Sequence, residues 1–243
     1  MRLNRYIAHA GICARRKADE LIAAGKISVN GIVVNEPGSR VKPGDVVKYG
    51  KKQLKPERYM YVLLNKPKDL ITSTSDDRGR KTVIEYLMPL LKNNSLHNNL
   101  RLYPVGRLDR NTTGVLLITN DGELMQNLTH PSREVSKVYL VTLDNPLEEN
   151  DRKKLLNGVL LEDGPIKFDN IDFPDTYRRQ EVGVEIHSGR NRIVRRTFEA
   201  LGYNVIKLDR TLFAGLTKKD LPRGKWRFLK EEEVVRLKHF KQT

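Results

Sequence analysis

The stretch VGRLDRNTTGVLLITNDG, residues 105–122, carries the most information about the fold. Its second half, GVLLIT, is an apolar run of the length of a buried strand, and the Asn-Asp-Gly that follows favours a turn. Its first half places Asp109 between Arg107 and Arg110, before a short polar turn. Two interpretations of Asp109 are open: it caps the turn through local hydrogen bonds, or it is a reactive carboxylate beside a buried strand.

Segments on both sides of this stretch alternate between strand-like and helix-like patterns. Strands are predicted over residues 59–67, 114–121, 137–144 and 182–188, and helices over residues 81–91, 122–130 and 191–202. The connections vary in length and show no regular βαβ period, so we predict an α+β fold with a mixed, mostly antiparallel sheet and flanking helices. The Asn-rich residues 93–99 are predicted to form an exposed loop.

The first quarter of the chain has the pattern of a separate small domain. Helices are predicted over residues 3–11 and 14–25, and Asn30-Gly31 between two apolar runs predicts a β-hairpin. The polar, basic residues 50–58 mark the boundary. We therefore predict two domains, residues 1–58 and 59–243.

Positive charge is concentrated in that first domain. Residues 1–60 contain 13 Lys and Arg against five Asp and Glu, and so hold +8 of the total formal charge of +15. Such a balance favours a polyanionic partner, either nucleic acid or an anionic membrane surface. No run of about 18 apolar residues and no secretory signal pattern occurs, so we expect no spanning helix and a cytoplasmic location.

The residues that bind metals and nucleotides are sparse. Cys13 is the only cysteine, and no two of the five histidines lie at a helical ligand spacing. Glycine-rich phosphate loops of the GxxxxGK[ST] or GxGxxG type are absent from the sequence. We therefore expect neither a metal nor a nucleotide cofactor.

The N-terminal string RLNRYIAHAGICARRKADELIAAGKISVNG, residues 2–31, resembles the alpha-L RNA-binding module first described in a ribosomal protein. The resemblance implies that the basic start of the second helix and the following hairpin track a phosphate backbone, whereas charge alone also fits a solvated helix face. That family commonly has Ser where this chain has Ala14, so a helix-capping hydroxyl worth roughly 1 kcal/mol is missing. The RNA-binding candidates are Arg2, Arg5, Arg15, Arg16, Lys17 and Lys26.

Residues 105–122 closely resemble the GRLD-x-x-T-x-G-L-L-L-L-T-N-D-G signature of the RsuA family of pseudouridine synthases, and residues 128–141 and 187–215 resemble its later motifs in the correct order. The resemblance implies that Asp109 is the catalytic aspartate, Tyr139 the active-site tyrosine and Arg195 the active-site basic residue. Ile193 replaces the Gln that is common in the family. The substrate-binding candidates that follow from the same motifs are Arg107, Leu208 and Arg210.

The implied reaction detaches uracil from its ribose at nitrogen 1 and reattaches it through carbon 5, without a cofactor. An ionised Asp109 either attacks the anomeric carbon or removes a neighbouring proton, and a cation such as Arg195 would favour the ionised form. The target base must be flipped out of the RNA, and Tyr139 is expected to pack on it. Taken alone, Tyr139 in a strand also fits a core aromatic, and Arg107 a surface ion pair with Asp109.

The layout is most similar to the RluB branch of that family, which implies a bacterial enzyme, acting as a monomer on large-subunit ribosomal RNA or a pre-ribosomal particle. The small-subunit RNA of the RsuA branch is an open alternative. A noncatalytic ribosome-assembly factor and a synthase for transfer RNA are the competing classes, and phosphate contacts alone do not distinguish these RNAs.

Overall fold

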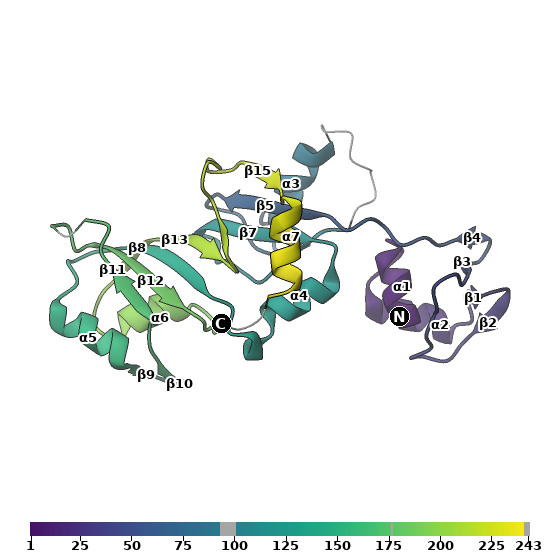
Figure 1. Ribbon diagram of the computed structural model, residues 1–243, viewed down its shortest axis with the longest axis horizontal. Helices are drawn as coiled ribbons and strands as arrows, with labels where there is room; N and C mark the ends of the chain where they lie inside the picture. The colour runs from purple at the N-terminus through teal and green to yellow at the C-terminus, as the bar shows by residue number, and fades with distance from the viewer. Residues whose placement is uncertain (93–100, 176, 241–243) are drawn as a thin grey trace. The chain divides into compact units, whose positions relative to one another are not determined.

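The computed structural model describes residues 1–92, 101–175 and 177–240, and the chain divides into two compact units (Figure 1). The first is built mainly from Met1–Met60, and the second from Tyr61–Asn94 and Leu102–Thr243. The loop predicted over residues 93–99 lies outside the described residues.

The N-terminal unit consists of two helices and a small sheet. Helices α1 (Leu3–His9) and α2 (Arg15–Ala23) confirm the predicted pair. The sheet has the strand order β2-β1-β3-β4, and Asn30 and Gly31, with φ of 53° and 85°, turn β1 into β2 as the Asn-Gly pair predicted. The strands are β1 (Ile27–Val29), β2 (Ile32–Val34), β3 (Val47–Tyr49) and β4 (Lys52–Gln53).

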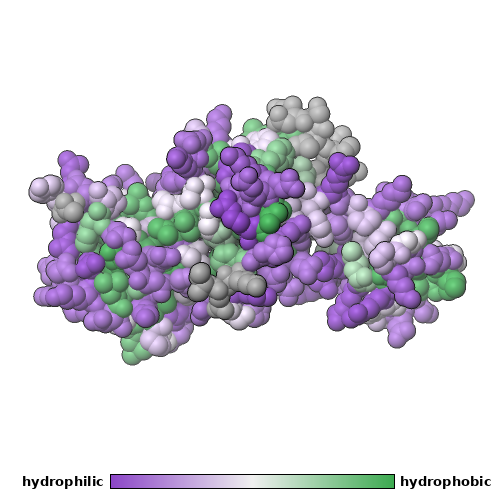
Figure 2. All heavy atoms as spheres, in the orientation of Figure 1, coloured by the Kyte–Doolittle hydropathy of each residue, from purple (hydrophilic) through white to green (hydrophobic). Residues whose placement is uncertain are grey.

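Apolar side chains from both helices and from β1 form the core of this unit. Leu3 and Ile7 of α1 and Ile22 of α2 are fully buried together with Ile27. Ala14 precedes α2 and makes no side-chain capping bond, because an alanine side chain has no hydrogen-bond acceptor. On the surface, Ile32 and Val33 give the β1–β2 hairpin an apolar patch within an otherwise mostly hydrophilic surface (Figure 2).

The C-terminal unit is built on a long sheet with the strand order β11-β12-β8-β13-β7-β5-β15. All neighbouring pairs on this path are antiparallel except β13 and β7, which run parallel, so the predicted mixed, mostly antiparallel sheet is confirmed. The strands are β5 (Tyr61–Lys66), β7 (Thr113–Thr119), β8 (Lys137–Leu143), β11 (Asn170–Asp172), β12 (Glu181–Ile186), β13 (Val205–Phe213) and β15 (Trp226–Phe228), with β6 (Tyr103–Pro104) and β14 (Leu216–Thr217) at its sides.

The parallel pair brings two backbones unusually close. A Cβ on Gly114 of β7 would lie 2.1 Å from the carbonyl oxygen and 2.6 Å from the nitrogen of Arg210 on β13, and Gly114 has a φ of +108°. Only glycine meets both conditions without strain. This contact sets the junction of β7 and β13 beside the turn that carries Asp109.

Helices flank the sheet and a separate hairpin projects beside them (Figure 1). Helix α4 begins where the side chain of Asp121 accepts hydrogen bonds from Glu123 and Leu124, and α5 and α6 pack near β11 and β9. None of the described helices is both long enough and apolar enough to cross a membrane. The elements are α3 (Val83–Lys92), α4 (Gly122–Thr129), the 3-10 turn η1 (Pro131–Arg133), α5 (Glu149–Asn157), the hairpin β9 (Val159–Leu161) and β10 (Gly164–Ile166), α6 (Ile193–Glu199) and α7 (Glu231–Lys238).

Candidate active site

The turn that carries Asp109 is fixed by hydrogen bonds on both sides. The Thr72 hydroxyl donates to the carbonyl oxygen of Leu108 at 2.7 Å and accepts from its N–H at 3.1 Å. After Asp109, the N–H of Thr112 donates back to the Asp109 carbonyl oxygen at 3.1 Å. These bonds leave the half-buried Asp109 carboxylate on a backbone with little freedom to move.

A buried lysine completes this turn. Lys66, at the end of β5, is fully buried, and its ammonium donates to the carbonyl oxygens of Asp109 and Arg110 at 3.2 Å and of Thr112 at 2.9 Å. Burial lowers the pKa of Lys66 to about 8, against the opposing effect of the Asp109 and Asp69 carboxylates. Lys66 was not predicted from the sequence; the signal that points to it is a charged residue at the end of an otherwise mostly apolar strand, two positions after Leu64.

A cavity of about 1000 Å³ opens in front of Asp109. Its lining comes from the Asp109 turn, from β8 and β13 and from the loop that precedes α6, so four segments far apart in the sequence meet there. Among the residues predicted from the sequence, it brings together Arg107, Asp109, Tyr139, Leu208 and Arg210.

Tyr139 and Arg210 form the floor of this cavity as a register pair of β8 and β13. Arg210 is 2% exposed; its Nε donates to the Val115 carbonyl oxygen at 2.8 Å, and its guanidinium lies 4.5 Å from the centre of the Phe213 ring. Burial lowers the pKa of Arg210, while a hydrogen bond with Tyr139 opposes that effect. One terminal nitrogen of the guanidinium is buried and has no hydrogen-bond partner among the described residues.

Arg195 lies in the first turn of α6, and it donates to the carbonyl oxygen of Val205 at 2.6 Å. Burial and the nearby Arg192 lower the pKa of Arg195, and the charge of Asp109 acts in the opposite direction. Within the described residues, no ion pair joins Asp109 to Arg195 or to Arg107; Arg107 is exposed, and the salt bridge of this turn runs from Arg110 to Asp69 at 3.1 Å. Arg195 thus acts on the Asp109 carboxylate through space rather than by direct contact.

Several cavity residues were not predicted from the sequence. Lys137 of β8 donates to the carbonyl oxygens of Val135 at 2.7 Å and His187 at 3.0 Å, and burial lowers its pKa to about 8. Nδ1 of His187 lies 2.9 Å from a carboxylate oxygen of Asp169, which accepts the hydrogen bond. Ile193, which replaces the common Gln, is buried and also lines the cavity. The other unpredicted arginines of the lining are Arg80, Arg110, Arg190 and Arg192.

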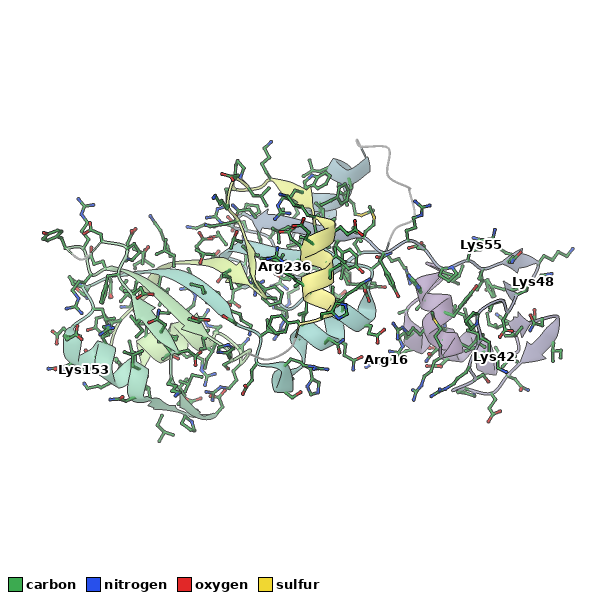
Figure 3. All side chains as sticks on the ribbon, in the orientation of Figure 1. Arg16, Lys42, Lys48, Lys55, Lys153 and Arg236 are labelled. Carbon is green, nitrogen blue, oxygen red and sulfur yellow. The ribbon has the colours of Figure 1, made fainter. Side chains whose placement is uncertain are left out.

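The six basic residues predicted to bind RNA all lie in the N-terminal unit. Arg2 precedes α1 and Arg5 lies within it; Arg15, Arg16 and Lys17 open α2, and Lys26 precedes β1. All are exposed except Arg5, which is half-buried, and Lys17 pairs with Glu20 at 2.5 Å. Further exposed cations, among them Lys42, Lys48 and Lys55, extend outward from the same unit (Figure 3). In the described part of the chain, no group of three or more His, Cys, Asp or Glu side chains is arranged to hold a metal ion.

Comparison with known proteins identifies the chemistry of this site. Residues 60–200 match the family model of RNA pseudouridylate synthase, and residues 1–47 match that of the S4 domain. A crystal structure of a pseudouridylate synthase superposes with a TM-score of 0.67 at 30% identity, covering 98% of this chain and 99% of that one.

Curated relatives match over nearly the whole chain. The ribosomal large subunit pseudouridine synthase B of Bacillus subtilis is 40% identical over 98% of this chain and 95% of its own length. The dual-specificity RNA pseudouridine synthase RluF of Escherichia coli is 33% identical over 98% of this chain and 78% of its own. An uncharacterized RNA pseudouridine synthase of Aquifex aeolicus is 37% identical over 98% of this chain and 93% of its own. With its Asp109 turn, its cavity and its N-terminal S4 domain, the chain belongs to the RNA pseudouridylate synthase family.

Proposed function

We propose that this pseudouridine synthase isomerises a uridine of large-subunit ribosomal RNA, with Asp109 as the catalytic carboxylate. The observation that carries the proposal is the position of Asp109 on a hydrogen-bonded turn at a cavity that Tyr139 and Arg210 also line. The preference for the large-subunit RNA rests on the name of the Bacillus subtilis relative, which is 40% identical.

The cavity residues divide into groups that react and groups that hold the base. Asp109 acts on the sugar, either at the anomeric carbon or on a neighbouring proton, and Arg195 supplies a positive charge near it. Tyr139 packs on the flipped uracil beside its register partner Arg210. Leu208 adds an apolar contact, and the exposed Arg107 contacts the RNA at the cavity edge.

The two units divide the work. Residues 1–58 act as the RNA-binding domain, where Arg2, Arg5, Arg15, Arg16, Lys17 and Lys26 contact phosphates, and residues 59–243 act as the catalytic domain. The protein works as a monomer, in the cytoplasm, on ribosomal RNA or a pre-ribosomal particle. Because phosphate contacts do not read sequence, the catalytic domain must contribute to the choice of uridine.

Pseudouridine mapping tests the proposal. Carbodiimide-dependent reverse-transcription stops are mapped on both ribosomal RNAs from cells with the wild-type gene, without it, and with Asp109→Asn alone. The proposal predicts that one large-subunit stop disappears in both mutants. A lost stop in small-subunit RNA would move the substrate to that RNA, and a stop lost on deletion but kept with Asp109→Asn would overturn the role of Asp109. Unchanged stops in both strains would favour a noncatalytic assembly factor.

A further inference from the structure

A carboxylate outside the cavity lining accepts hydrogen bonds from two arginines. Both arginines belong to the segment that forms one side of the cavity. Asp163 lies in the turn between β9 and β10. Arg196 of α6 donates to its two oxygens at 2.9 and 2.6 Å, and Arg190 donates to one of them at 3.0 Å. A carboxylate shared by two guanidiniums in this way fixes both of them in direction as well as distance.

Arg190 also binds the backbone of the same turn. It donates to the carbonyl oxygens of Asp163 at 2.9 Å, Gly164 at 3.1 Å and Pro165 at 2.7 Å. Arg196 in turn donates to the carbonyl oxygen of Asn191 at 3.2 Å. The β9–β10 turn, the loop before α6 and the first turns of α6 are therefore bonded to one another through the Asp163 carboxylate and through backbone carbonyl oxygens.

The loop before α6 needs such an anchor because its backbone is strained. Arg192, which lines the cavity and precedes α6, has a φ of +46° and caps the helix with no side-chain bond. A left-handed conformation at a residue with a side chain costs of order 1 kcal/mol and persists only where surrounding contacts impose it. Arg195 and Arg196 are neighbours on the same short helix, so the orientation of one depends on the anchor of the other.

We propose that Asp163 is a positioning residue for the pseudouridylation reaction. Through Arg190 and Arg196 it holds the loop at residues 187–192 and the start of α6, so that Arg192 keeps its place in the cavity lining and Arg195 its place near Asp109. This inference rests on the proposed function, since it assumes that the cavity takes the target uridine. Hydrogen bonds from Arg196 hold the pKa of the Asp163 carboxyl below its usual range, so the anchor stays charged at neutral pH.

The chain supplies a closely matched control. Glu149 of α5 is also shared by two arginines, accepting from Arg152 at 3.0 Å and from Arg179 at 2.7 Å. The Glu149 side chain is 47% exposed, against 43% for that of Asp163. Glu149, Arg152 and Arg179 all lie outside the cavity lining. Loss of either carboxylate removes a similar ion-pair cluster, but only Asp163 contacts the side of the cavity.

The test compares Asp163→Ala, Asp163→Glu and Glu149→Ala on large-subunit ribosomal RNA transcribed with 5-tritiated uridine, because isomerisation releases the hydrogen of carbon 5 to water. At saturating enzyme, Asp163→Ala should lower the single-turnover rate constant at least tenfold, with the Kd for RNA within threefold, because small displacements of reacting groups reduce rates strongly. Asp163→Glu should recover much of the rate. Glu149→Ala should stay within twofold of the wild type.

Hydrogen exchange of the folded variants, followed by mass spectrometry, adds a local measurement. Asp163→Ala should speed exchange in residues 187–196, whereas Glu149→Ala should not. A rate for Asp163→Ala within twofold of the wild type would overturn the inference, as would equal losses in the Asp163→Ala and Glu149→Ala variants. If the wild-type enzyme itself releases no tritium from this RNA, the proposed substrate fails first, and the exchange result alone decides whether Asp163 anchors the loop.

Discussion

The ammonium of Lys66 lies 3.2 Å from the backbone carbonyl oxygen of Asp109, and the lysine is entirely shielded from solvent. A buried cation is stable only when its donors are paired, and here the acceptors are carbonyl oxygens of the turn that carries Asp109. The lysine therefore links the end of β5 to the position of the Asp109 carboxylate, and it couples the stability of the fold to the geometry of the site.

Replacing this lysine should damage stability and activity together. Lys66→Met leaves several buried carbonyl oxygens without their donor, at a cost of about 1–3 kcal/mol each, partly offset by removing a buried charge. We expect urea unfolding to show a loss of at least about 2 kcal/mol, and tritium release to slow because the Asp109 turn loosens. Lys68→Met, at an exposed position, is the control. Equal stability of the two variants would contradict this role for Lys66.

The two buried lysines should make stability rise with pH above 8. Burial lowers the pKa of Lys66 and of Lys137 to about 8, whereas an unfolded lysine has a pKa of about 10.4. Between these values the unfolded chain binds more protons than the folded chain, so the free energy of unfolding increases with pH across that window. In urea unfolding at pH 7.5, 8.5 and 9.5, Lys137→Met should reduce this increase by about half. The same slope in Lys137→Met as in the control Lys153→Met, at an exposed position on α5, would show that Lys137 is not the group that titrates.

Gly114 should tolerate no side chain. In Gly114→Ala, the new methyl group would lie 2.1 Å from the Arg210 carbonyl oxygen at a φ of +108°, so β7 and β13 must separate. We expect a loss of more than about 3 kcal/mol or insoluble protein, measured by thermal unfolding and soluble yield. Gly122→Ala is the control, since nothing lies within 4 Å of its added carbon. Similar melting temperatures for both variants would refute the close approach.

The Tyr139 hydroxyl should matter for the reaction more than for RNA binding. Tyr139→Phe keeps the aromatic face but loses the hydroxyl, which acts on the pKa of Arg210. We expect the single-turnover rate to fall at least tenfold, within the range for a group that assists proton transfer, while the Kd for RNA changes less than threefold. Tyr86→Phe, which loses a hydroxyl bond to the Gly224 carbonyl oxygen outside the cavity, should keep its rate. A Tyr139→Phe rate equal to that of Tyr86→Phe would reduce Tyr139 to a packing residue.

Local signals in the sequence predict much of the fold. The Asn30-Gly31 turn and the strands β5, β7 and β8 can be predicted from residues that are adjacent in the sequence. The structure confirms the turn and the three strands. The hairpin of β9 and β10 and helix α5 are not predicted, because three-residue strands and a helix with one buried apolar side chain leave no clear period.

The sequence predicts a residue of the site only where a family motif includes that residue. Lys66 and Arg210 are buried and Lys137 is half-buried, and their hydrogen-bond partners lie from one to 95 positions away in sequence. Ordinary sequence patterns assign such charged residues to the surface. The motifs of the pseudouridine synthase family point to Arg210, but they point to neither of the two lysines. The parallel pairing of β7 with β13 depends on a backbone contact that is visible only in three dimensions.

The most direct test of the account is the rate of tritium release by purified Asp109→Asn protein, measured in single turnover with 5-tritiated ribosomal RNA and accompanied by RNA-binding measurements. Asp69→Asn, which changes an exposed carboxylate outside the cavity lining, serves as the control. The account predicts a fall of at least a thousandfold for Asp109→Asn with RNA binding within threefold of the wild type, and little change for Asp69→Asn. A rate for Asp109→Asn within tenfold of the wild type would contradict the assignment of Asp109 as the catalytic carboxylate.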